Sequence, residues 1–116
     1  MTVRSTPSRL NPDAMRAHAD DAAQLLKALA NDKRLLILCL LARGEHSVGE
    51  LNTLLDLSQS ALSQHLAVLR EEGMVNTRRE AQTIYYSLAP GPAFEVIQTL
   101  YGIYCAPKRS QRKSKP

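Results

Sequence analysis

The chain has 116 residues and a mass of 12.8 kDa, which is the size of one domain. Hydrophobic residues make up 44% and charged residues 22%. This composition is that of a globular protein and not of a chain that is disordered throughout. The longest unbroken apolar run, Leu35 to Ala42, is far shorter than the roughly 20 residues that cross a bilayer. The N-terminal residues lack the apolar stretch of a secretory signal. We therefore expect a cytoplasmic protein with no membrane contact.

The charge is distributed unevenly along the chain. The formal net charge is +4 and the isoelectric point about 9.3. Between Asp13 and Cys105, however, the net charge is −3, and the basic excess lies in the two ends of the chain. The basic tail, residues 106–116, is either a solubilising extension or an additional contact to phosphates, and composition does not decide between them.

Two helices are predicted at the start of a domain spanning residues 12–105, which follows a disordered segment, residues 1–11. Asn11-Pro12-Asp13 is typical of a helix start. From there to Ala30, apolar residues recur at three- and four-residue steps, which predicts one amphipathic helix. These residues are Ala22, Leu25, Leu26 and Leu29. The second helix contains Leu35 to Ala42, with Asn31 or Asp32 as its cap and Gly44 beyond its end.

Two further helices, separated by a tight turn, are predicted in the centre of the chain. Ser47-Val48-Gly49-Glu50 fits a capping box that opens a short helix from Val48 to Leu55. Ser58 caps a longer helix from Gln59 to Glu72, and Gly73 ends it. The residues expected inside are Leu51, Leu54 and Leu55 of the short helix and Leu62, Leu66 and Leu69 of the longer one. Gln59, Ser60, Ser63 and Gln64 are left on the outer face.

After Gly73 the apolar pattern changes to a period of two, which predicts strands. The strands are Val75 to Arg79 and Thr83 to Leu88, connected as a hairpin by Glu80-Ala81-Gln82. A last helix follows from about Pro92 to Cys105. Its apolar residues form two stripes, Phe94, Ile97, Tyr101 and Tyr104 on one side and Val96, Leu100 and Ile103 on the other. The predicted fold class is mainly α with a small β-hairpin wing, a winged helix-turn-helix.

A short helix, a tight turn and a longer helix with a polar outer face are typical of a unit that places its second helix in the DNA major groove. Glutamine pairs bidentately with adenine, and serine donates or accepts at several bases. The candidate base-contacting residues are therefore Gln59, Ser60, Ser63 and Gln64, and the candidate wing contacts to phosphates or the minor groove are Arg78, Arg79 and Gln82. The alternative is a merely solvated face. We favour DNA binding because a solubilising face usually carries Glu and Lys, and we expect His65 to be structural.

The apolar surface of the last helix exceeds what packing against a small domain requires. This surplus predicts a homodimer formed through the first and last helices, which would contact a pseudo-palindromic operator. The alternative is that both apolar stripes belong to the core of a single chain.

Two stretches, LLKALANDKRLLILCLLARGEHSVGEL and LSQSALSQHLAVLREEGMVNTRREAQTIYYSL, resemble the ArsR/SmtB family of small winged-helix repressors. The resemblance extends from about Ala22 to Cys105, and the spacing of serines, His65 and leucines from Ser58 to Leu69 is its most specific part. It implies a winged fold, a dimer built on the first and last helices, and an inducer that weakens operator binding.

Many members of that family sense metals. The positions of the metalloid-binding cysteine pair are Asn52 and Leu54 here, and the last helix has no His or Asp, with Glu95 as its only acid. The three histidines, His18, His46 and His65, show no ligand spacing. We therefore expect no metal and no other cofactor, with a metal-sensing repressor kept as the alternative.

The two cysteines, Cys39 and Cys105, have the positions found in the redox- and persulfide-sensing branch of the family, typified by BigR, SqrR and HlyU. That resemblance implies a dithiol that an oxidant or a reactive sulfur species bridges, after which the dimer releases DNA. From the residues alone, each cysteine is equally well a small apolar filler.

An enzyme is not expected, because the chain has no glycine-rich phosphate loop and no nucleophile–base motif. The remaining alternatives are an anti-silencer and an interaction module that lacks thiol sensing.

Overall fold

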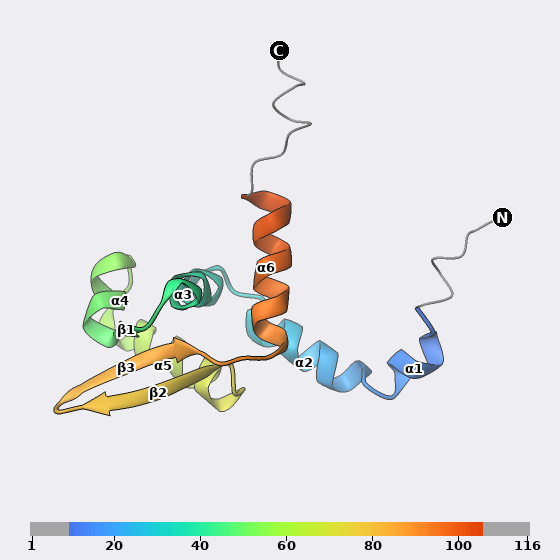
Figure 1. Cartoon of the computed structure of the whole chain (residues 1–116), viewed down its shortest axis with the longest axis horizontal. Helices are drawn as coiled ribbons and strands as arrows, with labels where there is room; N and C mark the ends of the chain where they lie inside the picture. The colour runs from blue at the N-terminus through green and yellow to red at the C-terminus, as the bar shows by residue number, and fades with distance from the viewer. Residues whose placement is uncertain (1–9, 106–116) are drawn as a thin grey trace, which may run out of the picture.

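The structure is a computed structural model that describes residues 10–105; the predicted end segments lie outside it, apart from residues 10 and 11. The elements in chain order are α1 (Pro12–Arg16), α2 (Ala19–Leu29), α3 (Asp32–Arg43), β1 (His46–Ser47), α4 (Val48–Leu54), α5 (Gln59–Glu71), β2 (Val75–Glu80), β3 (Thr83–Leu88) and α6 (Pro92–Tyr104) (Figure 1). Helices and one small antiparallel sheet make up the described part, which confirms the predicted fold class. No helix among the described residues is long and apolar enough to cross a membrane.

The predicted helix caps are made by the expected side chains. Asn31, rather than Asp32, caps α3, and its Oδ1 accepts from the backbone N–H groups of Lys33 and Arg34 at 2.9 and 3.0 Å. The capping box of α4 is complete, with the Glu50 N–H donating to Ser47 Oγ at 3.1 Å and the Ser47 N–H to Glu50 Oε1 at 2.8 Å. These bonds satisfy backbone donors that a helix start leaves free, so short sequences determine where the helices begin.

The prediction of one continuous first helix is wrong. The chain leaves the helical conformation at His18, where φ is −120° and ψ is 4°, and this separates α1 from α2. No residue of α1 is buried, so no tertiary contact holds it in line with α2. A short helix without packing is marginal in water.

The sheet has three strands in the order β1-β3-β2, and the sequence pattern did not reveal β1. This two-residue strand pairs His46 with Tyr86 and Ser47 with Tyr85. The connection between β2 and β3 is also shorter than predicted, because Glu80 pairs with Thr83 and only two residues form the turn. Ala81 adopts a φ of 56° there, a left-handed conformation that costs a non-glycine residue about 1–2 kcal/mol.

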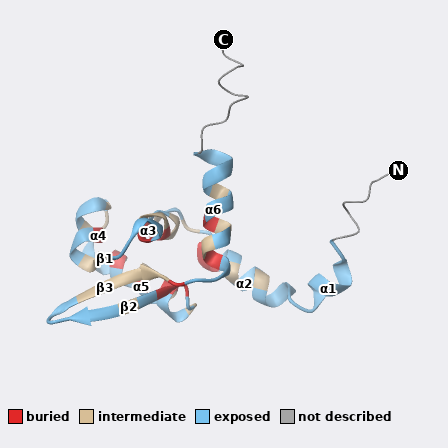
Figure 2. Ribbon diagram, viewed as in Figure 1, coloured by how far each residue is buried: buried red, intermediate tan, exposed pale blue. Residues whose placement is uncertain are grey.

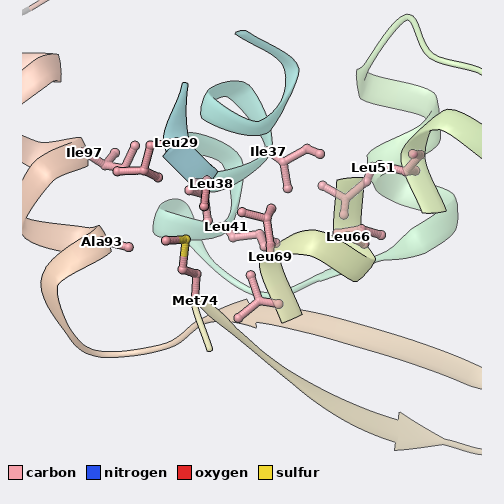
Figure 3. Close-up of a cluster of buried hydrophobic side chains, with 13 residues drawn as sticks. Leu29, Ile37, Leu38, Leu41, Leu51, Leu66, Leu69, Met74, Ala93 and Ile97 are labelled. Atoms are coloured by element: carbon pink, nitrogen blue, oxygen red, sulfur yellow. The ribbon is translucent and has the colours of Figure 1, made fainter. Parts of the chain in front are cut away.

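The core lies between α3, α5, the base of α6 and the inner face of the sheet (Figures 2 and 3). Its fully buried large side chains are Ile37 and Leu38 of α3, Leu51 of α4, and Leu62, Leu66 and Leu69 of α5. The leucines at i, i+4 and i+7 of α5 are therefore inside, as predicted. Leu54 was predicted to point inward and does not, since 57% of it is exposed at the end of α4.

The helices at the two ends of the domain extend away from this core. Figure 1 shows α6 projecting from the body on one side and α1 with α2 on another. Their outer parts carry exposed apolar side chains, namely Leu10, Met15, Leu26, Tyr101, Ile103 and Tyr104. The apolar surplus predicted for the last helix is thus present on the surface of the single chain.

Candidate functional site

The outer face of α5 is held at the surface by contacts on the opposite side of the helix. Ser58 caps it, with the Ala61 N–H donating to Ser58 Oγ at 3.1 Å. Asn52 Nδ2 donates to the Leu57 carbonyl at 2.9 Å and so fixes the turn between α4 and α5. The four residues predicted to contact bases, Gln59, Ser60, Ser63 and Gln64, are all exposed on this helix. No acidic residue occupies its first turn, although the exposed carboxylate of Asp56 lies in the turn just before it.

Two polar contacts connect α5 to the preceding helices. Arg34 of α3 donates from Nε to the Ala28 carbonyl at 2.6 Å, and its Nη1 lies 3.4 Å from His65 Nδ1. Gln24 of α2 donates to both carboxylate oxygens of Glu72, the C-cap of α5, at 3.1 Å. His65 is partly buried, in agreement with its predicted structural role. These contacts connect α2 and α3 directly to α5.

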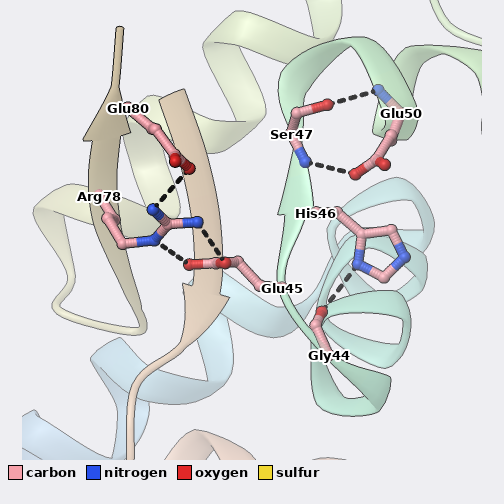
Figure 4. A network of polar contacts seen from close by, with 7 residues as sticks. All are labelled: Gly44, Glu45, His46, Ser47, Glu50, Arg78 and Glu80. Atoms are coloured by element: carbon pink, nitrogen blue, oxygen red, sulfur yellow. Dashed lines mark hydrogen bonds and ion pairs between the residues drawn. The ribbon is translucent and has the colours of Figure 1, made fainter. Parts of the chain in front are cut away.

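We define the wing as β2, β3 and their turn. The two basic residues predicted to contact DNA from the wing have different surroundings in the structure. Arg78 and Arg79 are consecutive in β2, so their side chains leave opposite faces of the sheet. Arg79 and Gln82 are exposed, and no carboxylate of the described residues forms an ion pair with Arg79. Arg78 instead contacts two carboxylates, Glu45 and Glu80 (Figure 4).

The two cysteines lie on helices that face each other across a groove of about 990 Å³. Cys39 of α3 is partly buried and lines this groove together with Leu36, Leu40, Leu55, Phe94, Ile97 and Tyr101. Cys105 is the exposed C-cap of α6. Burial raises the pKa of the Cys39 thiol, and the nearby charge of Cys105 raises it further. Cys105 is therefore near enough to Cys39 to affect its pKa, which their separation in the sequence does not reveal.

We expect Cys105 to react with iodoacetamide at least about tenfold faster than Cys39 at pH 7, because only the thiolate is nucleophilic. The raised pKa of Cys39 lowers its thiolate fraction below that of an ordinary cysteine at the same pH. Its alkylation rate should continue to increase with pH where that of an exposed peptide cysteine has levelled off. Mass spectrometry of the two cysteine peptides over a pH series measures both rates. Equal rates at pH 7 in the folded protein would contradict this assignment.

Metal ligands were also sought. The described residues contain no group of three or more His, Cys, Asp or Glu side chains arranged to hold a metal ion. At the positions of the family's metalloid-binding cysteine pair, Asn52 makes the bond that fixes the turn and Leu54 is exposed.

Three residues of this site were missed by sequence reasoning, namely Arg34, Glu45 and Asn52. Each acts through a contact beyond its own segment: Arg34 of α3 to the end of α2 and to α5, Glu45 of the loop after α3 to the wing, and Asn52 of α4 to the turn after that helix. Helical periodicity records only which side of a helix is apolar, so it carries no signal for such contacts.

Residues 31–77 match the family model described as bacterial regulatory protein, arsR family. The chain is 52% identical over 96 residues to the transcriptional activator HlyU of Vibrio cholerae, an alignment that covers 83% of this chain and 89% of HlyU. It is 53% identical over 97 residues to the biofilm growth-associated repressor of Agrobacterium fabrum, covering 84% and 83% of the two chains. The chain belongs to the ArsR family.

Solved structures of relatives agree with the fold of this ArsR-family protein. Reduced HlyU from Vibrio cholerae superposes with a TM-score of 0.75 at 53% identity, over 80% of this chain and 98% of that one. The transcriptional repressor BigR from Xylella fastidiosa superposes with a TM-score of 0.77 at 42% identity, over 84% and 99% of the two chains. The protein is a DNA-binding transcriptional regulator of the HlyU and BigR branch and not an enzyme.

Proposed function

We propose that this ArsR-family regulator is a homodimeric repressor whose operator affinity falls when Cys39 and Cys105 become covalently bridged. The observation that carries the proposal is the position of the two thiols on facing helices, since Cys39 of α3 lines the groove between α3 and α6, and Cys105 is the exposed C-cap of α6. The charge of Cys105 contributes to the raised pKa of Cys39. One of the similar solved structures is that of reduced HlyU from Vibrio cholerae. A repressor acts on the chromosome, which gives a cytoplasmic location.

The base-contacting surface in this proposal is the exposed polar face of α5, made by Gln59, Ser60, Ser63 and Gln64, with Arg79 and Gln82 of the wing as flanking contacts. The exposed apolar side chains on α2 and α6, such as Leu26, Tyr101 and Tyr104, support a dimer through these helices. A two-fold dimer sets its two α5 helices about one DNA turn, roughly 34 Å, apart on a pseudo-palindromic operator.

The thiol chemistry balances with an organic trisulfide, RS–S–SR, as the oxidant. The Cys105 thiolate attacks the central sulfur and releases one RS⁻, which leaves Cys105–S–S–SR. The Cys39 thiolate then attacks that same central sulfur and releases the second RS⁻. The product is a trisulfide bridge, and the two electrons lost by the cysteines are carried away by two RSH molecules. We assign the first attack to Cys105 because it is exposed, whereas the raised pKa of the partly buried Cys39 leaves a smaller fraction of that thiol as the thiolate than an ordinary cysteine has.

Bridging pulls the end of α6 toward α3, and α3 is mechanically connected to the DNA-contacting helix. Arg34 of α3 contacts His65 of α5 and holds the last carbonyls of α2. A shift of α3 therefore changes the orientation of α5 relative to the rest of the chain. In a dimer this also changes the spacing between the two α5 helices. Because the half-site spacing is a rigid property of DNA, a small change of angle costs affinity.

The test is binding to the DNA upstream of the protein's own gene, measured by fluorescence anisotropy at fixed salt. We expect treatment with glutathione trisulfide to weaken wild-type binding at least about tenfold, equal to about 1.4 kcal/mol. Cys39→Ser and Cys105→Ser should bind like reduced wild type and should not respond. Intact-mass spectrometry verifies the bridge in each sample.

A bridged wild type that binds as tightly as the reduced form would overturn the thiol switch and leave the DNA binding intact. The metal-sensing alternative predicts instead that a chelator changes the affinity of the reduced protein. An anti-silencer predicts that the protein restores transcription only when another DNA-coating protein is present.

A further inference from the structure

The guanidinium of Arg78 is engaged on three of its nitrogens (Figure 4). Nε and Nη2 donate to the two carboxylate oxygens of Glu45 at 2.9 and 2.8 Å, and Nη1 donates to Glu80 at 3.0 Å. The guanidinium carbon also lies 4.6 Å from the centre of the Tyr85 ring. A bidentate pair stacked on an aromatic ring has a defined geometry that a lysine does not reproduce.

We infer that Arg78 is a wing-positioning residue, held by Glu45, that sets the orientation of the wing on the operator without contacting a phosphate itself. This role rests on the DNA binding of the proposed function and is independent of the thiol switch. It differs from the role predicted from the sequence, in which Arg78 and Arg79 were equivalent basic contacts.

Glu45 lies just beyond the end of α3, far from Arg78 in the sequence. It is 33 residues from Arg78 in sequence and follows Gly44, the C-cap of α3. The ion pair therefore fastens β2 of the wing to the end of α3, a helix whose residues form the centre of the core. Beyond its ladder to β3, the outer part of β2 is exposed at Arg78, Arg79 and Glu80. Among the described residues, the Arg78–Glu45 pair is the one ion pair that connects this part of β2 to a segment outside the wing.

The second argument is the local charge. One arginine between two carboxylates leaves a net negative cluster, which repels phosphate rather than attracting it. Binding a phosphate would require Arg78 to break a bidentate pair first. Arg79 leaves the opposite face of the strand with no ion-pair partner among the described residues, so it is free to contact DNA.

The decisive variant is Glu45→Gln, because the two roles predict opposite signs. Removing a carboxylate near DNA ordinarily strengthens binding by reducing repulsion. If Glu45 positions the wing, operator binding by the reduced protein should instead weaken about two- to fivefold. Asp56→Asn is the matched control: Asp56 is an exposed carboxylate in the turn before α5, and its removal should leave binding unchanged or tighter.

The dependence of affinity on salt separates the two arginines. Arg79→Gln should reduce the slope of log Kd against log salt by about 1, the loss of one phosphate contact. Arg78→Gln should weaken binding as Glu45→Gln does and leave this slope unchanged. The double variant Glu45→Gln/Arg78→Gln should bind no worse than either single variant, because both remove the same interaction.

A measurement without DNA completes the test. Hydrogen exchange of the β2 and β3 amides should be faster in Glu45→Gln than in wild type, while the melting temperature stays within a few degrees. Tighter operator binding by Glu45→Gln, a smaller salt slope in Arg78→Gln, or unchanged wing exchange would each overturn the positioning role. The first two outcomes would instead make Arg78 a phosphate contact that Glu45 masks.

Discussion

Replacing Leu62 by alanine lowers the free energy of unfolding by about 2–5 kcal/mol. Leu62 lies on the inner side of α5 and has no exposed surface. Truncation removes its buried methyl groups and leaves a cavity between α5 and the rest of the core. A small domain has a total stability of about 5–15 kcal/mol, so this single change removes a large fraction of it. Urea denaturation followed by far-ultraviolet circular dichroism, under reducing conditions, measures the difference.

Leu54→Ala is the matched control, since it makes the same chemical change at a leucine that is 57% exposed. Its effect should stay within about 0.5 kcal/mol, as for most surface substitutions. A loss at Leu54 as large as that at Leu62 would contradict this assignment of core and surface. It would then locate Leu54 in a contact between two copies of the chain, which a dependence of stability on protein concentration would reveal.

We expect that replacing Gln64 by alanine will reduce the preference for the operator over shuffled DNA by about 1–3 kcal/mol, the value of one good bidentate base contact. Gln64 is exposed on the outer face of α5, so its loss leaves the core and the helix cap unchanged. Gln59→Ala should act in the same direction, and the two effects should add where the residues contact different base pairs.

The measurement is the ratio of two dissociation constants, for operator and for shuffled DNA of equal length, at one salt concentration. Affinity for the shuffled DNA serves as the internal control and should stay unchanged, because contacts to phosphates dominate nonspecific binding. An unaltered ratio in Gln59→Ala, Ser63→Ala and Gln64→Ala would refute base contact by this face. It would favour a protein-interaction module on the same fold.

Features that depend on neighbouring residues were predictable from the sequence. Three such features are present, namely the Ser47–Glu50 capping box, the Ser58 cap and the end of α5 near Gly73. Each of them depends on only a few consecutive residues. The spacing of Leu62, Leu66 and Leu69 identified the buried side of α5 because helical geometry repeats independently of the rest of the chain.

The errors occurred where the outcome depended on distant parts of the chain. The pattern of Leu51, Leu54 and Leu55 predicted three buried leucines, yet only Leu51 is fully buried. Strand β1 exists because His46 and Ser47 meet β3, and two residues carry no strand pattern of their own. The break at His18 likewise follows from the lack of any packing on α1.

The sequence by itself determined the winged helix-turn-helix, its polar helix face and its family, since caps, periodicity and motif spacing are local properties. Only the tertiary structure decided how two residues of the same type differ in their contacts and exposure. Arg78 is paired with Glu45 while Arg79 has no ion-pair partner among the described residues, and Cys39 is partly buried while Cys105 is exposed. The physical reason is that ion pairing, burial and thiol pKa depend on what the fold brings near a side chain, as for Arg78 and Glu45, which are 33 residues apart in the sequence.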